Sequence, residues 1–281
     1  MSRNGLSPPS DLAGRRATAR DPDRFELKYW VPEEVVPRIV EYAAPYLMLD
    51  PHGVKGADRQ QCNTSLYLET RGLDLFRAHV DSYADRYKLR VRAYGDPPSG
   101  LAFFEMKRKL DNRCLKTRAA VPLKEVKPLI EGTYTSLPAI LSPVDRRHLE
   151  AFLYAVTVTQ AAPFVLVRAY RESYCSRDRL EDVRLTFDRQ IGFQPISVPD
   201  LCGSPDAWSP INGEEQHGRR GPQVLVELKF PKVAPYWMRK LIDRLELERV
   251  AFSKYVSSVR AMLEEPGADQ YLWDAAGARY S

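Results

Sequence analysis

The stretch RYKLRVRAYG at residues 86–95 alternates apolar and basic side chains. Successive side chains of a β-strand point to opposite faces of the sheet. Leu89 and Val91 therefore share one face, while Lys88, Arg90 and Arg92 share the other. The stretch predicts a strand with one apolar face and one strongly basic face.

The same alternation recurs along the chain and predicts an α+β protein. The segments that we interpret as strands are 24–30, 64–70, 86–95, 101–110, 114–122, 164–174, 183–190 and 223–230. Apolar residues at helical spacing predict helices between them, at 32–47, 72–84, 143–156, 234–250 and 251–265. Many strands with helices in the crossings favour antiparallel pairing.

The charged strand faces have two interpretations. The simpler one is a half-buried sheet whose solvent face is charged, as in most antiparallel sheets. Against it, the face is almost entirely charged over six strands, and many of its cations are Arg, whose planar fork of donors suits phosphate oxygens. A Glu-x-Lys pairing also recurs three times, and carboxylates among cations can hold a metal that bridges phosphate oxygens. The three pairs are Glu26/Lys28, Glu105/Lys107 and Glu227/Lys229.

The second interpretation places these faces inside a closed antiparallel β-barrel. About eight strands enclose enough room for side chains or one extended ligand. Roughly ten cations there would repel one another by several kcal/mol at an effective dielectric of about 20, so a polyanion and a metal would be needed to neutralise them. The apolar faces would point outward under the helices. We assign the tyrosines of these strands to this outer layer: Tyr67, Tyr87, Tyr94 and Tyr170.

Composition restricts the protein class only weakly. The net charge of +5 comes from 42 basic and 37 acidic residues and does not by itself favour a nucleic acid or a membrane. The four cysteines are scattered without a CxxC motif, which favours reduced thiols and a cytoplasmic location. The most apolar window, 151–167, is shorter than the roughly 20 residues that span a bilayer. Aromatic residues are almost absent from the charged faces, which disfavours nucleic-acid binding.

The chain divides into one main domain with flanking segments. Residues 1–20 are rich in Arg, Ser, Pro and Gly and predict a disordered leader. Residues 21–265 form the predicted domain, and 194–222 within it read as a long insertion loop. Residues 266–281 are expected to be a loosely docked tail.

Nine short motifs in order carry a family resemblance. They are FELKYWV, SLYLET, YKLRVRAYG, FFEMKRK, LKTR, VRAYRESY, VRLTFD, VELKF and FSKY, from about Arg24 to Tyr255. Each motif alone is weak, but the ordered set resembles a VTC domain. VTC domains are the polyphosphate-polymerase branch of the triphosphate tunnel metalloenzymes, the CYTH superfamily. The resemblance implies a tunnel of antiparallel strands that takes a triphosphate end-on.

The resemblance also implies roles for individual residues. The implied metal is Mn²⁺ or Mg²⁺, held by Glu227 with help from Glu26 or Glu105. Arg168 and Arg171 are an odd number of residues apart on one strand, so one of them must point away from the tunnel. The motif favours Arg171 as the one that points into it. The implied phosphate contacts are Lys28, Arg90, Arg92, Lys107, Lys116, Arg171, Lys229 and Lys254, with Lys88, Arg118 and Arg184 as additional wall cations.

The implied activity is metal-dependent phosphoryl transfer on a nucleoside triphosphate or polyphosphate, with polyphosphate synthesis from ATP as the first choice. An inorganic or nucleoside triphosphatase, or a nucleotide cyclase, could use the same tunnel. A non-catalytic polyphosphate-binding module is the third alternative, although binding alone does not need the carboxylates. No P-loop, GxSxG or HExxH motif is present. Any translocation would need a membrane partner protein, and the oligomeric state and product length stay open.

Overall fold

The computed structural model describes residues 24–53, 59–111, 113–178, 181–211 and 222–264. The expected leader at 1–20 and tail at 266–281 lie outside the described residues. The same holds for residues 212–221 of the expected insertion loop.

The strands form one antiparallel sheet with the order β1-β10-β8-β7-β3-β4-β5-β6, to which β2 adds beside β7 and β9 beside β8. All eight predicted strands are present, with ends within a few residues of those expected. The short β2 and β9 were not predicted. The bounds are β1 (Arg24–Pro32), β2 (Leu47–Leu49), β3 (Gln61–Glu69), β4 (Asp85–Tyr94), β5 (Leu101–Leu110), β6 (Arg113–Pro122), β7 (Ala162–Ser176), β8 (Arg184–Pro195), β9 (Ser209–Pro210) and β10 (Gln223–Pro231).

The sheet is not the hydrogen-bonded closed barrel that we expected. Its order ends at β1 and β6, and within the described ranges these two edge strands share no backbone pairing. Alternation along a strand decides which face a side chain takes, but it does not decide whether the first and last strands pair. The two edges still approach across the charged face, because Glu26 on β1 lies near enough to Lys116 on β6 to act on its pKa.

The helices follow the predicted segments; most are shorter, whereas the helix predicted at 143–156 extends to Thr159. The predicted 32–47 helix is divided into a 3₁₀ turn (Glu33–Val35), α1 (Val36–Ala43) and then β2, with Pro37 in the first turn of α1. The 3₁₀ turn Leu123–Glu125 and α3 were not predicted. None of the helices in the described ranges is both long and apolar enough to cross a bilayer. The other helices are α2 (Asp74–Val80), α3 (Val126–Glu131), α4 (Pro143–Thr159), α6 (Tyr236–Arg244) and α7 (Lys254–Glu264).

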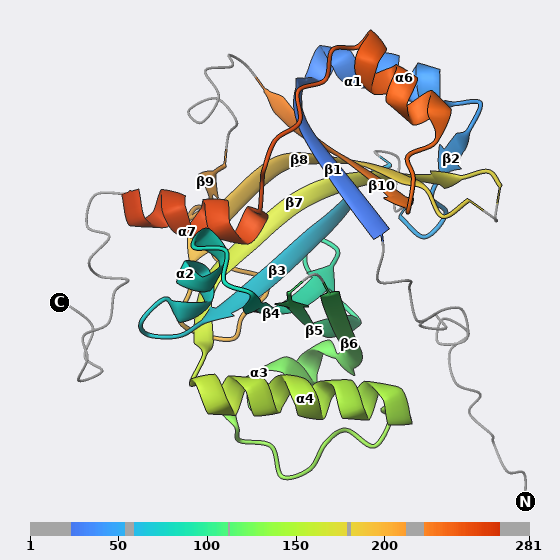
Figure 1. Ribbon diagram of the computed structural model, residues 1–281. Coiled ribbons are helices and arrows are strands. Elements are labelled where there is room, and N and C mark those ends of the chain that lie inside the picture. Colours follow the sequence, from blue (N-terminus) through green and yellow to red (C-terminus); the bar gives the residue numbers. More distant parts are fainter. Residues whose placement is uncertain (1–23, 54–58, 112, 179–180, 212–221, 265–281) are drawn as a thin grey trace, which may run out of the picture.

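Two helical layers cover the outer, apolar side of the sheet (Figure 1). On β3–β6, Leu89 and Phe104 pack in one buried cluster with Phe152 of α4. On β1, β10 and β8, Leu228 packs in a second cluster with Leu241 of α6. These two layers match the expectation that amphipathic helices bury the apolar strand faces.

A third apolar cluster lies on the opposite side of the sheet, which we had expected to be charged throughout. Trp30 and Leu225 share strand parity with Lys28 and Glu227, yet they pack in the cluster that α7 completes. The charged face therefore gives way to an apolar area where α7 covers it. The expectation that every apolar strand face points outward is wrong at this end, because an amphipathic helix lies on the inner face.

Candidate functional site

Basic side chains from distant strands meet at the start of α7. Lys28 on β1 donates from Nζ to the carbonyl oxygen of Phe252 at 2.9 Å. Lys88 on β4 donates from Nζ to Oγ of Ser253 at 2.8 Å. Since β1 and β4 are separated by four strands in the sheet order, these contacts require the sheet to curl around the N-terminus of α7. We call the side chains that face this space the charged face.

Glu227 on β10 is the centre of one half of the charged face. It is 4% exposed, and four cations surround its carboxylate. Burial alone would raise its pKa, but these cations outweigh burial and hold the pKa well below its usual value. The N–O distances are 2.5 Å to Lys229, 3.1 Å to Arg171, 3.2 Å to Lys254 and 3.6 Å to Lys28.

Asp188 on β8 is a second carboxylate of this half, to which we had assigned no role. Arg171 holds it with two hydrogen bonds of 2.6 Å, and Lys254 Nζ lies 2.5 Å from it. The side chain is fully buried, which opposes its charge, but Arg171 and Lys254 lower its pKa to about 2. The sequence did carry a signal, because Asp188 shares strand parity with Thr186 and Arg184 on the charged face.

The other half of the charged face, on β3–β6, holds fewer acidic groups. Glu105 accepts from Arg90 Nε at 2.6 Å and lies 3.5 Å from Arg118. Desolvation opposes its charge, but Arg90 together with Arg92 and Arg118 lowers the pKa of Glu105 to about 2. Arg92 donates from Nε to Oγ of Ser65 at 3.0 Å. Among the described residues of this half, clustered arginines therefore surround the ionised carboxylate of Glu105.

Three lysines form a row across β4, β5 and β6. Lys88 pairs in register with Lys107, which pairs with Lys116. Burial and the neighbouring Lys107 lower the pKa of Lys88 to about 7, and partial desolvation with the same neighbour lowers that of Lys116 to about 8. Among the residues that the structure describes, no carboxylate lies within ion-pair distance of the three. Like charges are therefore crowded where a bound anion could relieve them.

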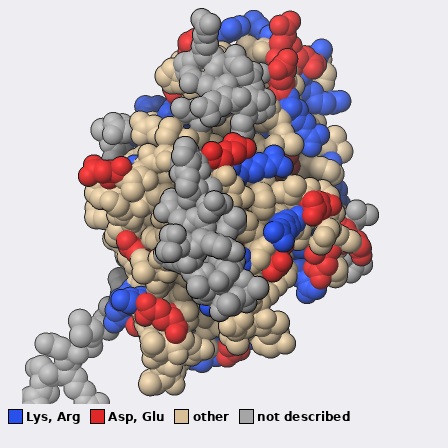
Figure 2. All heavy atoms as spheres, turned by 90° about the vertical axis from the view of Figure 1, so that its left-hand side faces the viewer, with Lys and Arg blue, Asp and Glu red and all other residues tan. Residues whose placement is uncertain are grey.

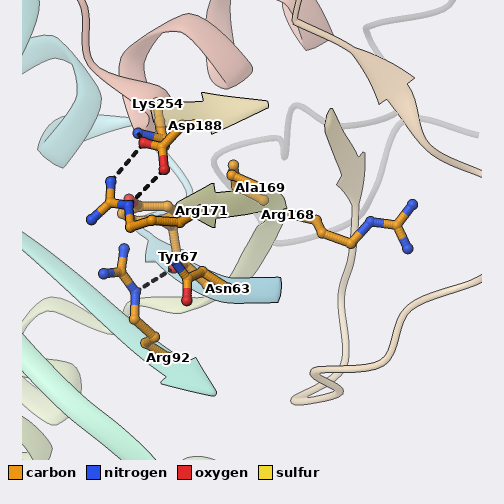
Figure 3. A pocket seen from close by; sticks show the side chains of 10 residues that line it. Asn63, Tyr67, Arg92, Arg168, Ala169, Arg171, Asp188 and Lys254 are labelled. Carbon is orange, nitrogen blue, oxygen red and sulfur yellow. Dashed lines mark hydrogen bonds and ion pairs between the residues drawn. The ribbon is translucent and has the colours of Figure 1, made fainter. Parts of the chain in front are cut away.

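The remaining predicted cations lie at the margins. Arg184 on β8 lies 3.9 Å from Asp50, beside the end of β2. Arg168 turns away from the charged face, over the ring of Trp208 at 4.2 Å, whereas Arg171 points into it (Figure 3). A register shift between Arg168 and Tyr170 in β7 accompanies this difference.

Two tyrosines contradict our assignment to the outer layer. Tyr67 accepts from Arg90 at 3.4 Å, and Tyr94 accepts from Arg118 at 3.3 Å, so both hydroxyls face the charged side. Tyr87 does pack against the outer cluster under α4. The assignment relied on the apolar rings and disregarded strand parity, which places Tyr94 with Arg92.

The carboxylates of the charged face fit a metal ion only if the oxygens of a bound phosphate complete its coordination. Within the described residues, no group of three or more His, Cys, Asp or Glu side chains is arranged to hold an ion. Glu227 and Glu26 share the cations Lys28 and Lys229, whereas Glu105 is engaged by Arg90 and Arg118. Mg²⁺ commonly binds through one or two carboxylates and the oxygens of substrate phosphates. Glu227 with Glu26 fits that kind of site.

The charged face is not a surface patch on the side of α7. Figure 2 looks at the molecule from that side, and there acidic and basic side chains are interspersed among other residues. A small pocket on the inner side is lined by Arg92, Arg171, Asp188 and Lys254, together with Asn63 (Figure 3). The basic groups thus converge inside the fold more than on this outer surface.

Comparison with known families agrees with this arrangement. The family model described as the VTC domain matches residues 23–263, which is most of the chain. The chain belongs to the VTC domain family. This is a family of phosphotransferases that bind triphosphates.

Similarity to individual proteins is much weaker. A solved structure from Bacillus halodurans, provisionally assigned as an adenylate cyclase, is 14% identical with a TM-score of 0.46. The match covers 82% of this chain and 95% of that one. No curated protein matches the chain.

Proposed function

We propose that this VTC domain is a metal-dependent phosphotransferase that makes polyphosphate from ATP. The observation that supports the proposal is an imbalance of charge on one inward-facing surface. Among the described residues, ten of the predicted basic side chains share the charged face with the ionised carboxylates Glu26, Glu105, Asp188 and Glu227. A polyanion inside the fold would neutralise the excess. The ten are Lys28, Lys88, Arg90, Arg92, Lys107, Lys116, Arg118, Arg171, Lys229 and Lys254.

The division of the charged face into two halves supports phosphoryl transfer in particular. Such transfer requires positioning and charge neutralisation more than covalent chemistry by the protein. The half around Glu227 and Asp188 offers ionised carboxylates beside cations, which suits a phosphate-bound Mn²⁺ or Mg²⁺. Such an ion would neutralise charge that develops on the transferred phosphoryl group. The lysine row offers cations without acidic partners, which suits a second phosphate chain acting as acceptor.

A triphosphatase is the second candidate, because the same site would hydrolyse its substrate if water replaced the acceptor phosphate. The ionised Glu227 disfavours the third candidate, a non-catalytic binding module. Burying a carboxylate among cations that are meant for an anion reduces the affinity for that anion, so a metal role accounts better for its presence.

The test is to incubate the pure protein with ATP and Mn²⁺ and to identify the products. Acid-stable phosphate polymer supports the synthesis of polyphosphate, and free orthophosphate alone supports the triphosphatase. Cyclic nucleotide supports a cyclase. Binding of triphosphate without turnover would support the non-catalytic binding module. If the protein neither bound nor turned over triphosphate, the proposal would be contradicted.

A matched pair of variants tests whether the charged face is the site. Lys107 and Arg108 are neighbours on β5 that point to opposite faces, and Arg108 pairs with Asp85 on the outer side at 2.6 Å. We expect Lys107→Met to reduce turnover at least tenfold, an effect of the size expected for losing one charged contact. Arg108→Met should leave turnover unchanged. Equal effects of the two substitutions would place the site elsewhere.

A further inference from the structure

Asn63 on β3 is a buried amide for which the proposed function has so far no use. Its side chain lines the pocket beside Arg92, Arg171 and Lys254 (Figure 3). The residue is 7% exposed, and within the described part of the chain its Oδ1 atom has no hydrogen-bond partner.

The neighbouring polar groups of β3 are accounted for, which makes this amide exceptional. Ser65 Oγ accepts from Arg92 at 3.0 Å, and Tyr67 Oη accepts from Arg90 at 3.4 Å. A buried amide oxygen without a partner destabilises a fold, so most such groups in proteins are bonded to protein or to ordered water. Because Asn63 lies on the wall of a pocket lined by cations, a ligand in that pocket can supply the missing partner.

The pocket around Asn63 has the donors and walls of an anion subsite. The Nε atom of Arg92 donates to Ser65, while its two terminal nitrogens make no hydrogen bond or ion pair within the described residues. Val167 and Ala169 of β7 also line the pocket and belong to the apolar cluster under α7. The subsite therefore combines free guanidinium donors and a neutral amide with an apolar wall.

The chemistry of the amide selects among phosphate groups. An internal phosphate of a linear chain has two non-bridging oxygens, whereas a terminal phosphoryl group has a third, which carries a proton for part of the time near neutral pH. An amide can donate to this oxygen from Nδ2 or accept its proton at Oδ1, and the two orientations of an Asn side chain are nearly equal in shape. A further cation could make only the first of these contacts.

We infer that Asn63 and Arg92 form a subsite for the terminal phosphoryl group of a linear phosphate chain, with Asn63 bonded to its third oxygen. This inference rests on the proposed function, since it assumes that the charged face takes phosphate chains. It adds that the pocket binds a chain end in preference to an internal segment.

The substitution Asn63→Leu tests the inference with little risk to the fold. Leu has the same number and branching of side-chain heavy atoms as Asn and removes a buried oxygen that has no partner, so the midpoint of urea unfolding should stay the same or rise. The probes are linear tripolyphosphate, which has two terminal groups, and cyclic trimetaphosphate, which has none. We expect Asn63→Leu to bind tripolyphosphate about tenfold more weakly, as for the loss of one hydrogen bond to a charged group, and trimetaphosphate unchanged.

A buried hydroxyl group on the other face of the sheet provides the matched control. Thr117 on β6 also has an Oγ1 atom without a partner among the described residues, but it lies between Lys116 and Arg118 and so points to the opposite face. Thr117→Val should change neither affinity. Isothermal titration calorimetry of the wild type and both variants with each probe completes the design.

The outcomes separate this inference from the proposed function. Equal tripolyphosphate affinity of wild type and Asn63→Leu would overturn the inference and leave the proposed function in place. An equal loss for the linear and the cyclic probe would also overturn it, because Asn63 would then contact an internal phosphate. A wild-type protein that binds neither probe would overturn both.

Discussion

Replacing Glu227 with Gln should cost stability that a bound polyanion restores. The substitution keeps the shape of the side chain and removes its negative charge. Four cations would then lose the carboxylate that they contact at 2.5 to 3.6 Å. Arg171 and Lys254 would still form ion pairs with Asp188, and Lys28 would still pair with Glu26 at 3.0 Å. Part of the positive charge would therefore stay neutralised.

The size of the effect follows from the burial of Glu227. Removing one partner of a buried ion pair typically costs about 3–5 kcal/mol, because the other charge is left without compensation. We expect a value near the lower end, about 3 kcal/mol, since Asp188 and Glu26 remain. For a domain of this size such a loss lowers the midpoint of thermal unfolding by about 6–12 °C.

The assay is urea unfolding of wild type and Glu227→Gln, with and without tripolyphosphate and without metal. The anion brings negative charge to the same cations, so the difference in unfolding free energy between the two proteins should shrink when tripolyphosphate is added. Metal-dependent turnover should be lost in the variant, with a smaller loss of anion binding in metal-free buffer.

Glu172→Gln is the matched control, because Glu172 is also largely buried and pairs with Arg189 at 3.0 Å, but on the other side of β7. It should lose stability to an extent that tripolyphosphate does not restore. If tripolyphosphate left the Glu227→Gln deficit unchanged, or restored both variants equally, the anion would not bind at the cations around Glu227. An unchanged metal requirement would refute the assigned role of Glu227.

Three further predictions follow from the charge pattern. Arg90→Ala should abolish turnover and cost about 3 kcal/mol in urea unfolding, because Glu105 loses its closest partner; wild-type-like turnover would contradict the site. Binding of tripolyphosphate at pH 8 should take up protons, because the pKa of Lys88 is about 7 and an anion raises it. Calorimetry in buffers of different ionisation enthalpy measures the proton uptake, and Lys88→Met should reduce it. Equal proton uptake by the wild type and the variant would show that Lys88 is not the group that takes up the proton. The depressed pKa values of Glu105 and Asp188, both about 2, stabilise the fold fully above their unfolded values near 4 and progressively less as pH falls toward 2. Urea unfolding between pH 6 and pH 2 should show this loss, and a smaller one in Glu105→Gln; the same loss in both proteins would mean that Glu105 contributes nothing.

The sequence predicts the strands and their charged faces well because both depend on local alternation. Lys28, Arg90, Lys107 and Lys229 face inward as strand parity requires, and β5 begins and ends where expected. Alternation does not predict how the two edges of a sheet meet, since that depends on twist and pairing across the whole sheet. The expected closure of the sheet into a barrel was therefore beyond what the pattern could support.

The contribution of α7 shows a second limit. Helical spacing predicted the helix, but nothing in that spacing indicates that it lies on the inner face, with Lys254 near Asp188 and Tyr255 in the apolar cluster. Only the motif FSKY pointed to Lys254. Trp30 and Leu225 carried the missing signal, because they interrupt the charged parity of β1 and β10. An apolar residue on an otherwise charged strand face indicates that something covers it.

The cations of the charged face differ in how available they are to a ligand, and this orders their expected roles. Arg171 and Lys254 are engaged by Asp188 and Glu227, so a phosphate that binds them must compete with buried carboxylates. Lys107 and Lys116 make no such contact among the described residues and gain the most from an anion. We therefore expect the lysine row to contribute chiefly to affinity. Arg171 and Lys254 would instead fix the carboxylates for a metal-bound phosphate, so that their loss lowers the rate of transfer more than it lowers binding.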